Sequence, residues 1–145
     1  MECVIFTGIQ ASGKSSFYKE RFFNTHIRIN MDMLKTRYRE KSLVMACIHG
    51  KQSFVIDNTN PTREDRVKYI EAVKQWRFKV IGYYFEPDYD ESVLRNETRQ
   101  GKEKIPNVAI KSTISKLQKP LFEEGFDELY HVKLIDGYFH VQELQ

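Results

Sequence analysis

A glycine loop near the N-terminus constrains this chain more than any other feature. A short apolar run, Cys3 to Phe6, is followed by Gly8, four further residues, and then Gly13-Lys14-Ser15. The next stretch, from Phe17 to Phe23, has a helical pattern. A strand, this loop and a helix in this order are the context in which the pattern binds phosphate groups.

The loop residues have chemical roles that follow from their types. Gly8 and Gly13 permit positive φ and close approach, so that successive N–H groups can surround an anion, and the helix N-terminus adds partial positive charge. We expect Lys14 to reach the β- and γ-phosphates and Ser15 to hold Mg²⁺. The alternative is a turn in which Ser12 or Ser15 merely caps the helix. The residues expected to bind the nucleotide are Gly8, Ile9, Gln10, Ala11, Ser12, Gly13, Lys14, Ser15 and Ser16.

Length and composition indicate an ordinary globular chain. The 145 residues suffice for one domain with a sheet covered on both faces, and the net charge of +3 is modest. Cys3 and Cys47 lie in apolar segments and are expected to be free thiols in a reducing compartment. We see neither a signal peptide nor an apolar run long enough to cross a bilayer, so the expected location is cytoplasmic, without membrane contact.

Strand and helix patterns alternate along the chain. Strands are expected at 3–6, 26–30, 53–56 and 79–85, and helices at 17–23, 43–48, 61–76, 90–100 and 110–117. Asp136-Gly137 predicts a C-terminal hairpin. This alternation predicts a three-layer α/β fold, in which a mainly parallel sheet of about five strands has helices on both faces, plus the hairpin.

Two details of this pattern concern the core. Pro61, with Asn60 as a cap, is expected to begin the helix whose apolar stripe is formed by Val67, Ile70, Val73 and Trp76. The aromatic residues Trp76, Phe85 and Phe122 are assigned to the core rather than to base stacking.

Two acidic residues follow expected strands and would meet the glycine loop at one edge of a parallel sheet. Asp32 is our candidate for the general base that takes a proton from an acceptor hydroxyl, and the alternative is that it caps the next helix. Asp57 could join Mg²⁺ binding or orient a basic partner, or it could serve only the turn chemistry of Asp57 to Pro61.

Two groups of cations are further candidates. Arg95 and Arg99 are four residues apart, and with Lys102 and Lys104 they could form a lid over the nucleotide at about 90–106. A second group could contact the phosphates of a nucleic acid. The alternative for both groups is a solvated helix face. The second group comprises Lys35, Arg37, Arg39 and Lys41.

These features together resemble the kinase domain of polynucleotide 5′-hydroxyl kinases, within the P-loop kinase group of the P-loop NTPases. The resemblance extends to about Leu134. It rests on the glycine loop and four further stretches: Ile29-Asn30-Met31-Asp32, Val55-Ile56-Asp57-Asn58-Thr59-Asn60-Pro61, Arg95-Asn96-Glu97-Thr98-Arg99 and Ile105-Pro106 with the helix that follows.

The resemblance implies a role for each matching residue. Asp32 would be the base that activates the 5′-hydroxyl, Asp57 would support a basic residue in the acceptor site, and Arg95 and Arg99 would be the lid arginines. Met31 stands where the family often has Arg. Lys35 stands where an Arg can grip the acceptor phosphate, and lysine keeps the charge but loses the bidentate geometry.

We therefore expect an ATP- and Mg²⁺-dependent kinase of a single domain, residues 1–145, whose acceptor is the 5′-hydroxyl of DNA or RNA. One alternative is a P-loop kinase of a small metabolite. Another is a nucleotide-binding module that regulates a partner and transfers nothing.

Overall fold

The computed structural model describes residues 1–101 and 104–145. The strands are β1 (Glu2–Thr7), β2 (Ile27–Ile29), β3 (Phe54–Ile56), β4 (Lys79–Phe85), β5 (Glu128–Ile135) and β6 (Tyr138–Glu143). The helices are α1 (Lys14–Arg21), α2 (Met31–Leu34), α3 (Arg37–His49), α4 (Arg63–Val73), α5 (Tyr89–Glu97) and α6 (Asn107–Lys116), together with the short 3₁₀ helix η2 (Phe122–Glu124).

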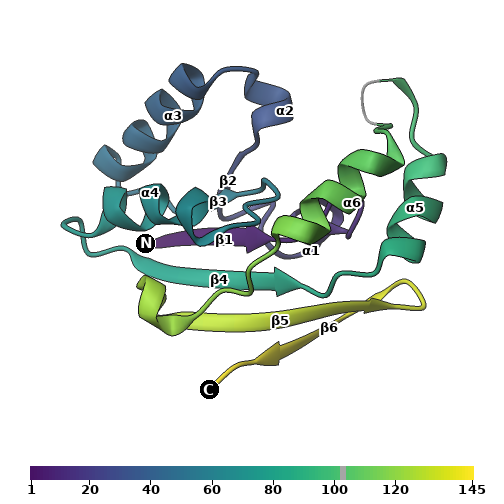
Figure 1. The fold of residues 1–145 in the computed structure, drawn as a ribbon. Helices are drawn as coiled ribbons and strands as arrows, with labels where there is room; N and C mark the ends of the chain where they lie inside the picture. Colours follow the sequence, from purple (N-terminus) through teal and green to yellow (C-terminus); the bar gives the residue numbers. More distant parts are fainter. Residues whose placement is uncertain (102–103) are drawn as a thin grey trace.

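The strands form one sheet in the order β2-β3-β1-β4-β5-β6. The first five are parallel to their neighbours, and β6 pairs antiparallel with β5. The carboxyl ends of the parallel strands therefore lie on the same side of the molecule, and α5 and α6 are found on that side (Figure 1). The predicted fold class is confirmed, with the hairpin extending the same sheet.

An apolar cluster lies on each face of the sheet because buried strand residues alternate between the two faces. On one face, Cys3 and Ile5 of β1 pack with residues of α3 and α4. On the other, Val4 and Phe6 pack with Phe17 of α1. The sheet is thus covered on both faces.

The helix expected to begin at Pro61 begins instead at Arg63. Thr62 is its N-cap and forms a reciprocal capping box with Asp65. Asn60 has a φ of 43°, and its side chain donates to the Phe6 carbonyl oxygen (2.8 Å), so it joins the turn to β1 rather than capping α4. The helix begins after Thr62 rather than after Asn60 because the Thr-x-x-Asp pattern satisfies two backbone N–H groups, those of Thr62 and Asp65. An asparagine cap would satisfy one.

Two of the three aromatic residues assigned to the core are half-exposed. Trp76 is 42% exposed and lies beyond the end of α4, and Phe122 is 40% exposed, whereas Phe85 is fully buried as expected. Val67 is likewise partly exposed. The burial stripe of α4 consists of Arg66, Tyr69, Ile70 and Val73.

The C-terminal hairpin agrees with the sequence. Asp136 and Gly137 both have positive φ, 52° and 80°, as a tight two-residue turn between twisted strands requires. Cys3 and Cys47 are free and buried, as predicted. Within the described residues, no helix has the length and apolar character needed to traverse a membrane.

Candidate functional site

The glycine loop connects β1 to α1 and requires glycine at both ends. Gly13, the N-cap of α1, has a φ of 96° and makes no side-chain cap hydrogen bond, so neither Ser12 nor Ser15 caps the helix. A Cβ atom on Gly13 would lie 3.1 Å from the Phe139 ring, and one on Gly8 only 2.8 Å from the Cβ of Phe85. The loop is therefore packed tightly against the sheet.

Lys14 lies inside the loop with little exposed surface. Its Nζ donates to the carbonyl oxygens of Gly8 (3.0 Å) and Ile9 (2.7 Å). Burial lowers the pKa of Lys14 to about 8, because desolvation disfavours the charged ammonium. The side chain is thus folded back onto the loop and is available to an anion.

Charges from three separate elements act on this ammonium group. The charges of Asp57 and Asp32 raise the pKa of Lys14, whereas that of Arg99 lowers it, all three being smaller effects than burial. Asp32 is carried by α2, Asp57 follows β3, and Arg99 follows α5. The structure therefore brings these candidates together around Lys14.

The unsatisfied buried side-chain polar atoms of the described residues lie in the glycine loop and at the end of β1 that leads into it. Across residues 1–101 and 104–145, the buried side-chain polar atoms without a hydrogen-bond partner are Thr7 Oγ1, Gln10 Oε1 and Ser12 Oγ. The first N–H groups of α1 also lack intrahelical partners. Buried polar groups are normally satisfied, so this concentration of unmatched atoms suits a loop that binds a polar ligand such as a polyphosphate.

Ser15 and Asp57 form a polar pair at the start of α1. The Ser15 hydroxyl donates to Asp57 Oδ2 (3.0 Å), and the Asp57 side chain is almost fully buried. A hydroxyl and a carboxylate are oxygen donors of the kind Mg²⁺ prefers, so this pair fits the expected metal site. Ser16 follows on the exposed surface of the same helix.

Arg28 of β2 is the basic partner of Asp57, and sequence reasoning missed it. Its Nε donates to Asp57 Oδ2 (2.8 Å) and its Nη2 to Ser15 Oγ (3.0 Å). Asp57 therefore orients a basic group, although that group comes from β2 and is not Lys35. An arginine within an otherwise apolar strand pattern was the signal that could have revealed this pair.

Asp32 is exposed at the start of the one-turn helix α2. The helix is capped by Asn30, whose side chain accepts from the Met33 N–H (3.0 Å), so the capping role considered for Asp32 belongs to Asn30. Asn30 Nδ2 also donates to the Asp57 carbonyl oxygen (2.6 Å). The two candidate acidic segments are thus joined directly.

A buried carboxylate holds α2 in place from behind. Glu40 of α3 accepts hydrogen bonds from Asn58 Nδ2 (3.0 Å) and from the Tyr69 hydroxyl (2.9 Å), and it forms an ion pair with Arg37 (2.8 Å). Asn58 in turn accepts from the Met31 N–H (2.9 Å). The position of Asp32 therefore depends on contacts between α3, α4 and the turn after β3.

The Arg95 side chain contacts the glycine loop from α5. Its Nη1 donates to the Ala11 carbonyl oxygen, which also accepts from Ser92 (3.4 Å). Arg99 lies beyond the end of α5, because the helix stops at Glu97, so the two arginines do not share a helix face. Lys102 falls outside the described residues.

The segment after α5 is closed by one asparagine. Asn96 donates to the Ile105 carbonyl oxygen (2.5 Å) and accepts from the Ile105 N–H (3.0 Å). The glycine loop also contacts α6, because Gln10 Nε2 donates to Thr113 Oγ1 (2.8 Å). A cavity of about 230 Å³ opens beside Ser12 and Arg95, between α5 and the end of β5.

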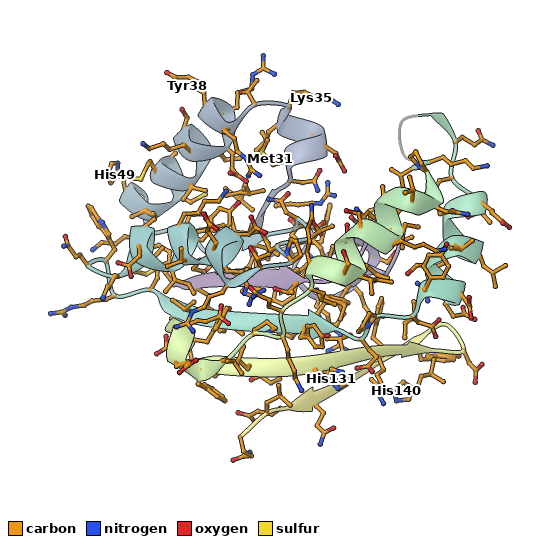
Figure 2. The ribbon with its side chains drawn as sticks, in the orientation of Figure 1. Met31, Lys35, Tyr38, His49, His131 and His140 are labelled. Atoms are coloured by element: carbon orange, nitrogen blue, oxygen red, sulfur yellow. The ribbon has the colours of Figure 1, made fainter. Side chains whose placement is uncertain are left out.

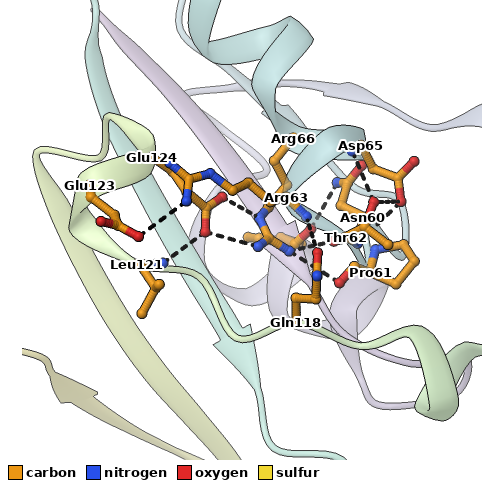
Figure 3. Close-up of polar contacts among 11 residues, drawn as sticks. Asn60, Pro61, Thr62, Arg63, Asp65, Arg66, Gln118, Leu121, Glu123 and Glu124 are labelled. Carbon is orange, nitrogen blue, oxygen red and sulfur yellow. Dashed lines mark hydrogen bonds and ion pairs between the residues drawn. The ribbon is translucent and has the colours of Figure 1, made fainter.

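A buried ion pair fixes the turn that supports the glycine loop (Figure 3). Arg66 Nε and Nη2 donate to the two carboxylate oxygens of Glu124 (2.9 and 3.0 Å), and Nη1 donates to the Asn60 carbonyl oxygen (3.0 Å). One residue earlier, the Thr59 carbonyl oxygen accepts from the Gly8 N–H (3.0 Å). Arg66 lies on the buried face of α4 with Ile70, and that placement was the available sequence signal.

The second cationic group lies on the outside of α2 and α3. Lys35 links the two helices in a left-handed conformation (φ 74°), and its side chain is exposed. Figure 2 shows Lys35 and Tyr38 projecting away from the sheet. The structure places Lys35 near the segment that bears Asp32, but the contacts of Asp57 are made by Arg28.

These features define a P-loop kinase-type domain of the P-loop NTPases. They are a mainly parallel sheet with this strand order, a glycine loop after β1 and basic residues after β4. A family model described as an AAA domain matches residues 3–121, so the chain belongs to that family.

Two curated proteins are similar in sequence. A bifunctional polynucleotide phosphatase/kinase of Schizosaccharomyces pombe is 28% identical over 135 residues, covering 90% of this chain and 33% of that protein. A putative bifunctional polynucleotide phosphatase/kinase of Acanthamoeba polyphaga mimivirus is 27% identical, covering 88% of this chain and 32% of that protein. The chain thus spans about a third of the length of these relatives.

Solved structures support the fold. Chaetomium thermophilum Kti12 superposes with a TM-score of 0.64 at 15% identity, covering 92% of this chain and 90% of that one. A gluconokinase from Sinorhizobium meliloti gives a TM-score of 0.62 at 15% identity, covering 91% and 82%. At such identities the likeness concerns the fold alone.

Proposed function

We propose that the chain is an ATP- and Mg²⁺-dependent kinase that transfers the γ-phosphoryl group to the 5′-hydroxyl of a polynucleotide. The observation that carries this proposal is that three segments meet at the glycine loop. Asp57 accepts from Ser15, Asn30 joins the segment that bears Asp32 to Asp57, and Arg95 donates to the Ala11 carbonyl oxygen. Phosphoryl transfer needs positioned substrates, a proton acceptor and positive charge near the transferring group. In the proposed site, these residues meet all three requirements.

In this mechanism the glycine loop and Lys14 bind the phosphates of ATP. Ser15 would hold Mg²⁺ with Asp57 behind it, and the ion when bound would neutralise developing phosphate charge. Asp32 accepts the proton of the acceptor hydroxyl. The oxygen of that hydroxyl forms a bond to the γ-phosphorus, while the bond between the γ-phosphorus and the bridging oxygen breaks and ADP leaves. Arg95 and Arg99, in the proposed lid at about 90–106, stabilise the charge that develops.

The polynucleotide acceptor is supported by the two curated relatives, which are named as polynucleotide phosphatase/kinases. The gluconokinase likeness keeps a small-metabolite kinase as the second candidate, because the same fold serves both acceptors. Lys35, at the entrance beside Asp32, is the proposed contact for an acceptor phosphate. We further propose that residues 1–145 act as one kinase domain.

The test is phosphoryl transfer from labelled ATP to a 5′-hydroxyl oligonucleotide, with nucleosides and sugars as competing acceptors. The oligonucleotide should be labelled, and Asp32→Asn should lower kcat about 10²–10⁴-fold while ATP binding is kept, because only the base is removed. Transfer to a sugar alone would favour the metabolite kinase. ATP binding without transfer to any acceptor would favour a regulatory module.

A further inference from the structure

The outer side of α2 and α3 combines exposed cations with an exposed aromatic ring. We define the outer α2–α3 surface by Lys35, Tyr38, Arg39 and Lys41. Tyr38 is 81% exposed, and the three cationic residues are exposed as well. Burial therefore explains none of these side chains.

This surface carries a net positive charge, because the exposed cations between residues 31 and 41 outnumber the exposed carboxylate, which is that of Asp32. Glu40 is the one acidic residue between 33 and 41, and it is buried against Asn58 and Tyr69. Among the described residues, Lys35, Arg39 and Lys41 form no ion pair with a carboxylate within 4.0 Å. A cationic strip of this kind attracts a polyanion.

The backbone holds the surface next to Asp32. The Arg39 guanidinium donates to the Leu34 carbonyl oxygen (3.2 Å), and Thr36 caps α3 by accepting from the Arg39 N–H (3.2 Å). Lys35 has a positive φ of 74°, which costs a non-glycine residue energy, and the turn at Lys35 connects α2 to α3. The surface thus follows Asp32 directly along the chain, from the end of α2 into the first two turns of α3.

Binding of a nucleic-acid strand explains an exposed tyrosine between cations better than an ordinary solvated helix face does. Lysine and arginine are ordinary on such a face, and the feature that distinguishes this one is an 81% exposed tyrosine that lies directly beside Arg39 and three residues before Lys41. Trp76 differs, because its ring packs against His49 with centroids 5.1 Å apart. Stacking on an aromatic ring requires an unpaired, accessible base, which is found in single strands.

We propose that the outer α2–α3 surface binds the single-stranded segment that follows the 5′-terminal nucleotide of the acceptor. Tyr38 stacks on a base of that segment, and Arg39 and Lys41 contact its phosphates. This inference rests on the proposed kinase function and deepens it, because it identifies the acceptor as a single-stranded 5′ end several nucleotides long.

The experiment measures kcat and KM for 5′-hydroxyl acceptors of increasing length, from a nucleoside 3′-monophosphate to a decanucleotide, and for a blunt duplex. KM should fall with length for single strands and stay high for the duplex. Tyr38→Ala should raise KM for the decanucleotide roughly five- to a hundredfold, the usual effect of losing one stacked base, with kcat unchanged. Tyr38→Phe should keep KM for the decanucleotide near the wild-type value, because the aromatic ring is retained.

Matched controls separate this surface from general effects. Trp76→Ala removes another partly exposed aromatic residue and should leave KM unchanged. Arg39→Gln should reduce the slope of log affinity against log salt by about 0.7 for the decanucleotide. If all acceptors react equally well and Tyr38→Ala behaves as wild type, the strand-binding surface is wrong while the kinase stands. If none of these acceptors is phosphorylated at any length, the kinase proposal itself fails.

Discussion

At the scale of the residue, burial changes the chemistry of Lys14 in the pH range where nucleotide binding can be measured. Its pKa of about 8 means that much of the side chain is neutral in the free protein at pH 8.5. Bound phosphates would restore the pKa to a high value because they stabilise the charged form. Nucleotide binding at that pH should therefore take up protons, and affinity should fall as pH rises above 8.

Calorimetry of ADP binding with Mg²⁺ at pH 8.5, in two buffers of different ionisation enthalpy, measures this uptake. We expect about half to one proton per ADP for the wild type. Lys14→Met, which has no titrating group at this position, should bind more weakly and show no uptake attributable to the lysine. Equal proton uptake by both proteins would show that Lys14 is charged in the free loop.

At the scale of the element, α4 and η2 are joined by one buried and one exposed ion pair. The side chains of Arg66 and Glu124 are almost wholly buried, whereas Arg63 and Glu123 are 52% and 65% exposed. Glu124→Gln leaves a buried guanidinium without its counter-charge and should lower the free energy of unfolding by about 3–5 kcal/mol. Glu123→Gln should cost less than about 1 kcal/mol, because water screens the exposed pair.

Urea unfolding of the two variants provides the comparison. Glu124→Gln should also weaken nucleotide binding, since the Arg66 contacts position the turn that accepts the Gly8 N–H. A double variant, Arg66→Met with Glu124→Leu, should recover much of the lost stability because no charge is then left buried. Equal costs for Glu124→Gln and Glu123→Gln would argue against this role of the buried pair.

At the scale of the whole molecule, the C-terminal hairpin supports a loop formed more than one hundred residues earlier. Phe139 of β6 packs edge-on against Phe17 (centroids 5.1 Å apart) and lies under Gly13. Phe139→Ala should lower the free energy of unfolding by about 1–3 kcal/mol, less than a fully buried phenylalanine. It should also weaken nucleotide binding, because Gly13 loses its support.

The neighbouring residue gives the control for this prediction. Tyr138 lies on the opposite face of β6 and is 73% exposed, so Tyr138→Ala should change stability by no more than about 0.5 kcal/mol. Both free energies come from urea unfolding, and ADP affinity from calorimetry. A Phe139→Ala protein with normal ADP affinity would show that the hairpin only completes the sheet.

The sequence by itself determined the glycine loop, the strand and helix order and the hairpin. These features depend on residues close together in the chain, whose backbone preferences act locally. The sequence also selected Asp32 by its position after a strand and Arg95 by its spacing from Arg99, and the resemblance supplied their proposed roles. The start of α4 was wrong because two local signals competed, and only the packed turn shows that Asn60 bonds to β1.

The tertiary structure alone decided which side chains meet. It paired Asp57 with Arg28, Glu40 with Asn58 and Arg66 with Glu124, each across separate elements. It also left Tyr38 exposed while burying Glu40 two residues away. Such contacts depend on how helices pack against the sheet, and a periodic pattern along the chain contains no information about that geometry.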